Sequence, residues 1–133
     1  MTEDFPEELK YNEDYSWIKK GDEETISLGI IKPAADRIQE FVFIALPEKG
    51  EKMQKGETYT SLEAMKWSGH LSSPITGEII EVNQELFQEP KKINQDPYKE
   101  WIVKMKLENK EELQELMNAE QAEKWWREKG KKS

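Results

Sequence analysis

Short strand-like runs follow one another along most of this chain, and turn residues separate them. Residues 25–31 alternate apolar with small or polar side chains, which is the two-residue period of a strand that buries one face. Further strands are predicted at 58–62, 78–82 and 101–107. Residues 41–46 are apolar on both faces and predict a central strand buried on two sides. The spacing favours a flattened β-barrel or sandwich over alternating β-α-β units.

Helical patterns occupy less of the chain. Pro33 begins a short predicted helix over 33–40. Asn109, followed by two glutamates, is typical of a helix N-terminus, and apolar residues then recur at helical spacing as far as Trp126. We therefore predict a mainly β fold with a short internal helix and C-terminal helices. One domain of 133 residues is expected, with a core at about 11–108, a helical segment at about 109–128 and a frayed end at 129–133.

Composition excludes several classes of function. Asp and Glu outnumber Lys and Arg by 28 to 20, so a net charge of −8 argues against binding to nucleic acid or to anionic lipid. The chain has no Cys and a single histidine, His70, which argues against a metal site or a nucleophilic triad. The longest apolar run, 41–46, is far too short to span a membrane. The acidic N-terminal residues do not have the pattern of a secretory signal or a transit peptide. A cytoplasmic protein is expected.

The most informative segment is 56–82, in which Lys66 lies between two predicted strands. A lysine at a hairpin tip is exposed, and its amine on a flexible stem is a common target for acylation. Gly77 follows eleven residues later in a Ser-Pro-Ile-Thr-Gly turn. This arrangement resembles the biotinyl/lipoyl carrier family, whose matching lysine holds biotin or lipoic acid in amide linkage.

The remaining motifs distinguish between the two kinds of carrier. Glu63-Ala64-Met65-Lys66 by itself is similar to the biotin carriers. Five ordered features spanning about residues 11–126 instead resemble the glycine cleavage system H protein family: Tyr11 with Trp17, Leu46-Pro47-Glu48-Lys49-Gly50, Ser73-Pro74-Ile75-Thr76-Gly77 with Asn83, Asn94-Gln95-Asp96-Pro97-Tyr98, and Trp101. The other carriers lack both the Asn-to-Pro-Tyr segment and the helical C-terminus. We therefore favour an H-protein-type lipoyl carrier.

This resemblance implies a non-catalytic carrier with lipoic acid on Lys66. It also implies that Glu63, Met65 and Trp67 are recognised by a lipoate ligase or lipoyltransferase and by partners. The lipoyl-lysine side chain, a flexible arm, would shuttle an aminomethyl group between glycine decarboxylase, aminomethyltransferase and dihydrolipoamide dehydrogenase. A monomer without catalytic or metal-binding residues is expected.

Departures from the family pattern gather near the lysine. Tyr15 stands where the family usually has histidine, Ile38-Gln39-Glu40 replaces Leu-Gly-Asp, and Trp67 replaces a small residue. Three alternatives therefore stay open: an H-like protein that carries sulfur between enzymes of a heterodisulfide-reductase-like oxidation pathway, a biotinyl carrier subunit, and an unmodified interaction module. The sequence leaves the roles of Tyr15, Trp67 and His70 undecided.

Overall fold

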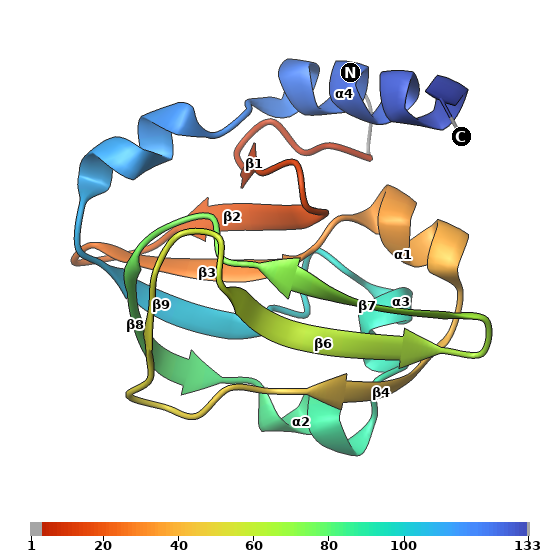
Figure 1. The fold of residues 1–133 in the computed structure, drawn as a ribbon, viewed down its shortest axis with the longest axis horizontal. Coiled ribbons are helices and arrows are strands. Elements are labelled where there is room, and N and C mark those ends of the chain that lie inside the picture. Colours follow the sequence, from red (N-terminus) through yellow and green to blue (C-terminus); the bar gives the residue numbers. More distant parts are fainter. Residues whose placement is uncertain (1–3, 133) are drawn as a thin grey trace.

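Two antiparallel β-sheets enclose one apolar core in the computed structural model, which describes residues 4–132 (Figure 1). The larger sheet has the order β1-β2-β3-β9-β8-β5, and the smaller has the order β4-β6-β7. The strands of the larger sheet are β1 (Lys10–Tyr11), β2 (Ser16–Lys20), β3 (Thr25–Ile30), β9 (Val103–Leu107), β8 (Gly77–Val82) and β5 (Lys52–Met53). Those of the smaller sheet are β4 (Phe41–Ala45), β6 (Thr58–Ala64) and β7 (Trp67–Ser72). The predicted mainly β sandwich or barrel, with a short internal helix and C-terminal helices, is confirmed.

The core forms where the inward faces of the two sheets meet. Trp17 of β2 is 2% exposed and lies against Gly29 of β3, where an added Cβ would come within 2.5 Å of the indole ring. A hydrogen bond of 2.7 Å between the hydroxyls of Ser16 and Tyr59 crosses from β2 to β6. It links the two sheets and leaves neither of these two buried hydroxyls unpaired.

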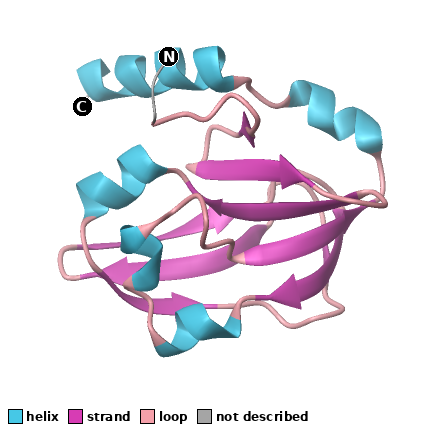
Figure 2. Ribbon diagram, turned by 180° about the vertical axis from the view of Figure 1, so that it is seen from behind, coloured by secondary structure: helices cyan, strands magenta, loops and turns pink. Residues whose placement is uncertain are grey.

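Helices cover the ends and one side of the sandwich (Figure 2). They are α1 (Lys32–Ile38), α2 (Gln84–Gln88), α3 (Lys92–Gln95), the 3₁₀ helix η1 (Lys110–Glu115) and α4 (Ala119–Lys132). Asn109 caps η1 as predicted, because its side chain accepts a hydrogen bond from the Glu111 N–H. A second cap, Asn118, exchanges hydrogen bonds with Gln121 and begins α4. α4 lies beside β1 and extends to Lys132, and Ser133 lies outside the described residues (Figure 1). Fraying at 129–133 stays a prediction.

Two strand predictions need correction. The prediction that 41–46 forms a central strand buried on two sides is wrong. β4 is an edge strand, and Val42 and Phe43 are exposed. An apolar run alone cannot reveal that only one face of its strand is covered. The predicted strand ranges also lacked 67–72: β7 closes the hairpin at Lys66, whereas the predicted strand 78–82 is β8 and belongs to the other sheet. No helix within residues 4–132 is both long and apolar enough to cross a membrane.

Candidate functional site

Lys66 lies at the tip of the hairpin formed by β6 and β7. Ala64 pairs with Trp67, so only Met65 and Lys66 form the turn, and both are exposed. Met65 has an exposed fraction of 84%. The Lys66 amine is therefore within reach of an enzyme that approaches this end of the molecule.

The hairpin is held firmly below its tip. Its two strands form six Cα pairs from Thr58–Ser72 to Ala64–Trp67, and β6 also pairs with β4. Leu62 of β6 and Leu71 of β7 are both fully buried in the core. Because the strands are anchored in this way, the amine projects from a rigid support while the lysine stem keeps its own freedom.

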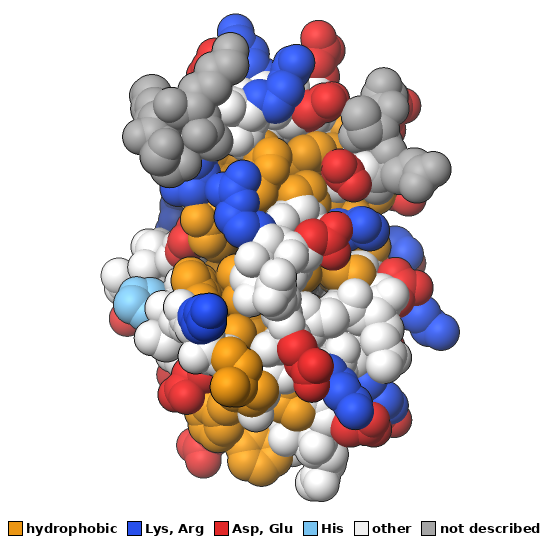
Figure 3. All heavy atoms as spheres, turned by 90° about the vertical axis from the view of Figure 1, so that its right-hand side faces the viewer, with side chains coloured by type: hydrophobic (Ala, Val, Ile, Leu, Met, Phe, Trp, Pro, Cys, Tyr) orange, Lys and Arg blue, Asp and Glu red, His pale blue; other side chains and the backbone are white. Residues whose placement is uncertain are grey.

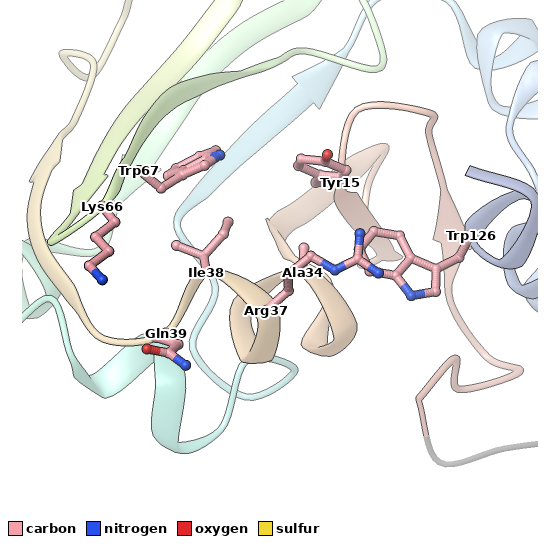
Figure 4. Close-up of a pocket in the computed structure, with 8 residues that line it drawn as sticks. All are labelled: Tyr15, Ala34, Arg37, Ile38, Gln39, Lys66, Trp67 and Trp126. Carbon is pink, nitrogen blue, oxygen red and sulfur yellow. The ribbon is translucent and has the colours of Figure 1, made fainter. Parts of the chain in front are cut away.

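A cavity of about 420 Å³ opens directly beside Lys66. Its lining comes from the hairpin, α1, the loop before β2, and α4: Tyr15, Ala34, Arg37, Ile38, Gln39, Lys66, Trp67 and Trp126. Figure 4 shows Lys66 at one end and Trp126 at the other, with Trp67, Ile38 and Ala34 between them. The cavity wall thus combines aromatic and aliphatic side chains with the amide of Gln39 and the cations of Lys66 and Arg37.

Aromatic rings close the end of the cavity away from Lys66. Tyr15 makes an edge-to-face contact with Trp126 at a centroid distance of 5.8 Å, and the Arg37 guanidinium lies 4.6 Å from the centre of the Trp126 ring. These contacts tie α4 to α1 and to the loop before β2. Trp125 and Trp126 are both half-buried and pack against the core.

The loop that carries Tyr15 is fixed to the hairpin strand β7. Asn12 accepts hydrogen bonds from the N–H groups of Asp14 and Ser16, each at 3.0 Å. The Asp14 carboxylate in turn accepts a bond of 2.7 Å from the Ser72 N–H. Tyr15 has a φ of 66°, which is uncommon for a residue with a Cβ, and this turn imposes it. The Tyr15 ring is therefore placed in the cavity wall by backbone geometry.

Asn94 of the Asn-to-Pro-Tyr motif positions another part of the wall. Its side-chain oxygen accepts a bond of 3.0 Å from the Phe41 N–H, and its side-chain NH₂ donates to the Gln39 carbonyl at 2.8 Å. The same group donates to the Ala35 carbonyl at 3.4 Å. One side chain on α3 thus fixes the junction between α1 and β4, which contains the cavity residue Gln39.

The structure brings some of the sequence-predicted site residues together and separates others. Lys66 and Trp67 share the cavity, Met65 projects from the turn, and Glu63 is exposed on β6. His70 is exposed on β7 and is not among the residues that line this cavity. Sequence reasoning missed Arg37 and Trp126 as site residues, although the departures from the family pattern at Tyr15, Ile38, Gln39 and Trp67 all lie in the cavity wall.

Residues 4–132 contain no group of three or more His, Asp or Glu that could hold a metal ion.

Comparisons with known proteins agree over nearly the whole chain. The family model described as glycine cleavage H-protein matches residues 9–129. The glycine cleavage system H protein of Staphylococcus carnosus is 37% identical over 118 residues, which cover 87% of this chain and 92% of that one. The H protein of Clostridioides difficile is 39% identical over 116 residues, covering 87% and 93%. A probable H protein of Pyrococcus horikoshii is 40% identical over 115 residues, covering 86% of each chain.

A solved structure is similar as well. The crystal structure of a glycine cleavage system H protein from Mycobacterium marinum superposes with a TM-score of 0.80 at 28% sequence identity. The match covers 95% of this chain and 99% of that one.

Proposed function

The chain belongs to the glycine cleavage H-protein family, and from that premise we propose that it is a lipoyl carrier of a glycine cleavage system, with lipoate in amide linkage to Lys66. The observation that carries this proposal is the place of Lys66 in a two-residue turn at the end of an anchored hairpin. Acylation of this amine needs no rearrangement of the fold.

The surroundings of Lys66 fit a lipoyl group. The neighbouring cavity of about 420 Å³ lies within the range of small-molecule sites, roughly 300–1,000 Å³. Ile38 and Trp67, both half-buried, offer apolar surface to the chain and ring of the group. When attached, a lipoyl group supplies a dithiol–disulfide pair that carries the one-carbon unit. Because the chain has no Cys, no protein thiol competes with that pair.

The chain's own residues act by presentation rather than by catalysis. The β6–β7 hairpin holds the attachment point away from the core. The exposed Glu63 and Met65 and the half-buried Trp67 around it are candidates for recognition by a lipoate ligase or lipoyltransferase. The loaded chain would then meet glycine decarboxylase, aminomethyltransferase and dihydrolipoamide dehydrogenase in turn. We expect these contacts to be transient, since a carrier must leave each partner.

An exchange assay tests this function. Lipoylated chain, mixed with glycine decarboxylase and labelled bicarbonate, should support glycine-dependent exchange of carbon dioxide. The chain bearing Lys66→Arg should not, because an arginine offers no amine for acylation. Absence of exchange with fully lipoylated chain and an active decarboxylase would contradict the glycine cleavage role.

One observation favours a second candidate. Four departures from the family pattern, at Tyr15, Ile38, Gln39 and Trp67, line the same cavity, and the cations on its wall are Arg37 and Lys66. The alternative is a carrier of sulfur on the same arm. In that case the lipoylated chain fails in the exchange assay although its loading is complete.

A further inference from the structure

Four large apolar side chains are exposed within residues 4–132, in a molecule that buries most of its apolar residues. Val42, Phe43, Met65 and Phe87 have exposed fractions of 51%, 42%, 84% and 52%, and we call them the apolar patch. Figure 3 shows hydrophobic side chains gathered in a band at the end of the molecule that contains the β6–β7 turn, with acidic and basic side chains beside it. Exposed apolar groups that gather in this way mark interaction sites.

A β-bulge creates the part of the patch on β4. Phe41 pairs with Ala64 and Phe43 pairs with Glu63, so Val42 is an extra residue with no opposite partner on β6. Regular alternation would bury one of the two residues Val42 and Phe43, whereas the bulge leaves both exposed. The free surface is therefore built into the pairing of the sheet.

α2 supplies the remaining ring. Phe87 meets Phe43 edge-to-face, with ring centroids 6.3 Å apart and planes at 68°. Leu86, the preceding residue, is fully buried and anchors α2 to the body of the protein. The two rings are thus held by separate elements that are each fixed in the core, which makes the surface preorganised for binding.

The patch reaches the modification site. Phe41 pairs with Ala64, the last residue of β6 before the turn, so the beginning of β4 lies beside the hairpin tip. Met65 of the patch directly precedes Lys66. A protein that covers the patch therefore also covers the backbone around Lys66.

The charges around the patch are mainly acidic. Glu40 precedes β4, Glu63 is opposite Phe43, and Glu89 follows α2; all three side chains are exposed. Glu85 lies on α2 as well and pairs with Lys92 at 3.3 Å. The chain as a whole carries a net charge of −8. A complementary partner presents an apolar surface bordered by Lys or Arg.

We propose that the apolar patch and its acidic border are the docking surface for the enzyme that attaches lipoate to Lys66. This inference rests on the proposed function. An attaching enzyme that uses ATP converts the lipoate carboxyl to an acyl adenylate, and the amide bond to Lys66 forms as the bond between the acyl carbon and AMP breaks and the amine loses a proton. This enzyme must bring the acyl carbon to the Lys66 amine itself, so its surface has to cover the hairpin tip and the strands beside it. Enzymes that act on the loaded group meet the far end of an extended arm and need no such cover.

Loading kinetics test the proposal with the full chain, a purified lipoate ligase, ATP and lipoic acid, followed by intact mass. Phe43→Ser and Phe87→Ser, on different elements, should each lower kcat/KM for loading by about tenfold, mainly through KM. Glu89→Lys should act in the same direction. The matched control is Glu111→Lys, the same charge reversal on the exposed η1 at the opposite end of the molecule (Figure 1), and it should leave loading unchanged.

The outcomes separate this inference from the proposed function. If the unaltered chain is not lipoylated at all, the proposed function fails. If it is lipoylated and the folded patch variants are lipoylated at the same rate, only the docking surface is refuted. Sedimentation provides a further check: a dimer that Phe43→Ser converts to a monomer would assign the patch to a second copy of the chain and overturn the proposal. Thermal melting of each variant confirms that it is folded.

Discussion

Replacement of Gln39 by glycine should stabilise this protein. Gln39 ends α1 with φ 76° and ψ −160°, a region that is essentially restricted to glycine. A side chain there costs on the order of 1–3 kcal/mol, whereas glycine loses roughly 0.5–1 kcal/mol more backbone entropy on folding than alanine does. The difference predicts that Gln39→Gly raises the free energy of unfolding by about 1 kcal/mol, or Tm by roughly 3–5 °C.

Two matched variants separate backbone strain from loss of the side chain. Gln39→Ala removes most of the side chain but keeps a Cβ, so it should remain less stable than Gln39→Gly. Glu40→Gly makes the same substitution at the next residue, which is not among those with positive φ, and should destabilise the protein by about 0.5–1 kcal/mol. Urea unfolding followed by tryptophan fluorescence measures all three. If Gln39→Gly is no more stable than Gln39→Ala, the strain assigned to this residue does not exist.

Two further predictions concern hydrogen bonds and pH. Asn94→Ala leaves the N–H of buried Phe41 and the Gln39 carbonyl without their partner, so it should lower the free energy of unfolding in urea by about 2 kcal/mol. The control Gln95→Ala, at the exposed neighbouring residue, should change it by less than about 0.5 kcal/mol. Equal stability of the two variants would refute the role of Asn94. Burial raises the pKa of the Tyr59 hydroxyl above its usual 10.0, as it does for Tyr11 and Tyr98. As pH rises, the unfolded chain therefore releases these protons before the folded chain does. Stability that is present below about pH 10 is lost above it, by about 1.4 kcal/mol per pH unit for each tyrosine. Tyr59→Phe should reduce the slope of the free energy of unfolding against pH by one proton, and an unchanged slope would argue against the burial of Tyr59.

Local patterns were sufficient for much of the fold. Alternation placed the strands that bury one face, such as 25–31, and Asn109 was correctly read as a cap. The five-residue helix α2 and the four-residue helix α3 were missed because they are too short for a 3.6-residue period to become visible. β4 was misread because the bulge at Val42 and the absence of cover over Phe43 are tertiary features.

Only part of the candidate site could likewise be predicted from the sequence. Lys66 could be singled out because its motif is continuous in sequence and its position in a hairpin follows from the flanking strands. The cavity beside it could not be predicted, since Tyr15, Arg37 and Trp126 come from a loop and two helices that meet only in the folded chain. The unusual residues around the lysine were visible, but their common location was not.

Intact mass and peptide mapping of the chain after incubation with lipoic acid, ATP and a lipoate ligase test the central claim most directly. The account predicts an increment of one lipoyl group, located on the peptide that contains Lys66, abolished by Lys66→Arg, and no signal on a streptavidin blot. An unchanged mass in the presence of a ligase that loads another acceptor, or a lipoyl group on a different lysine, would contradict it.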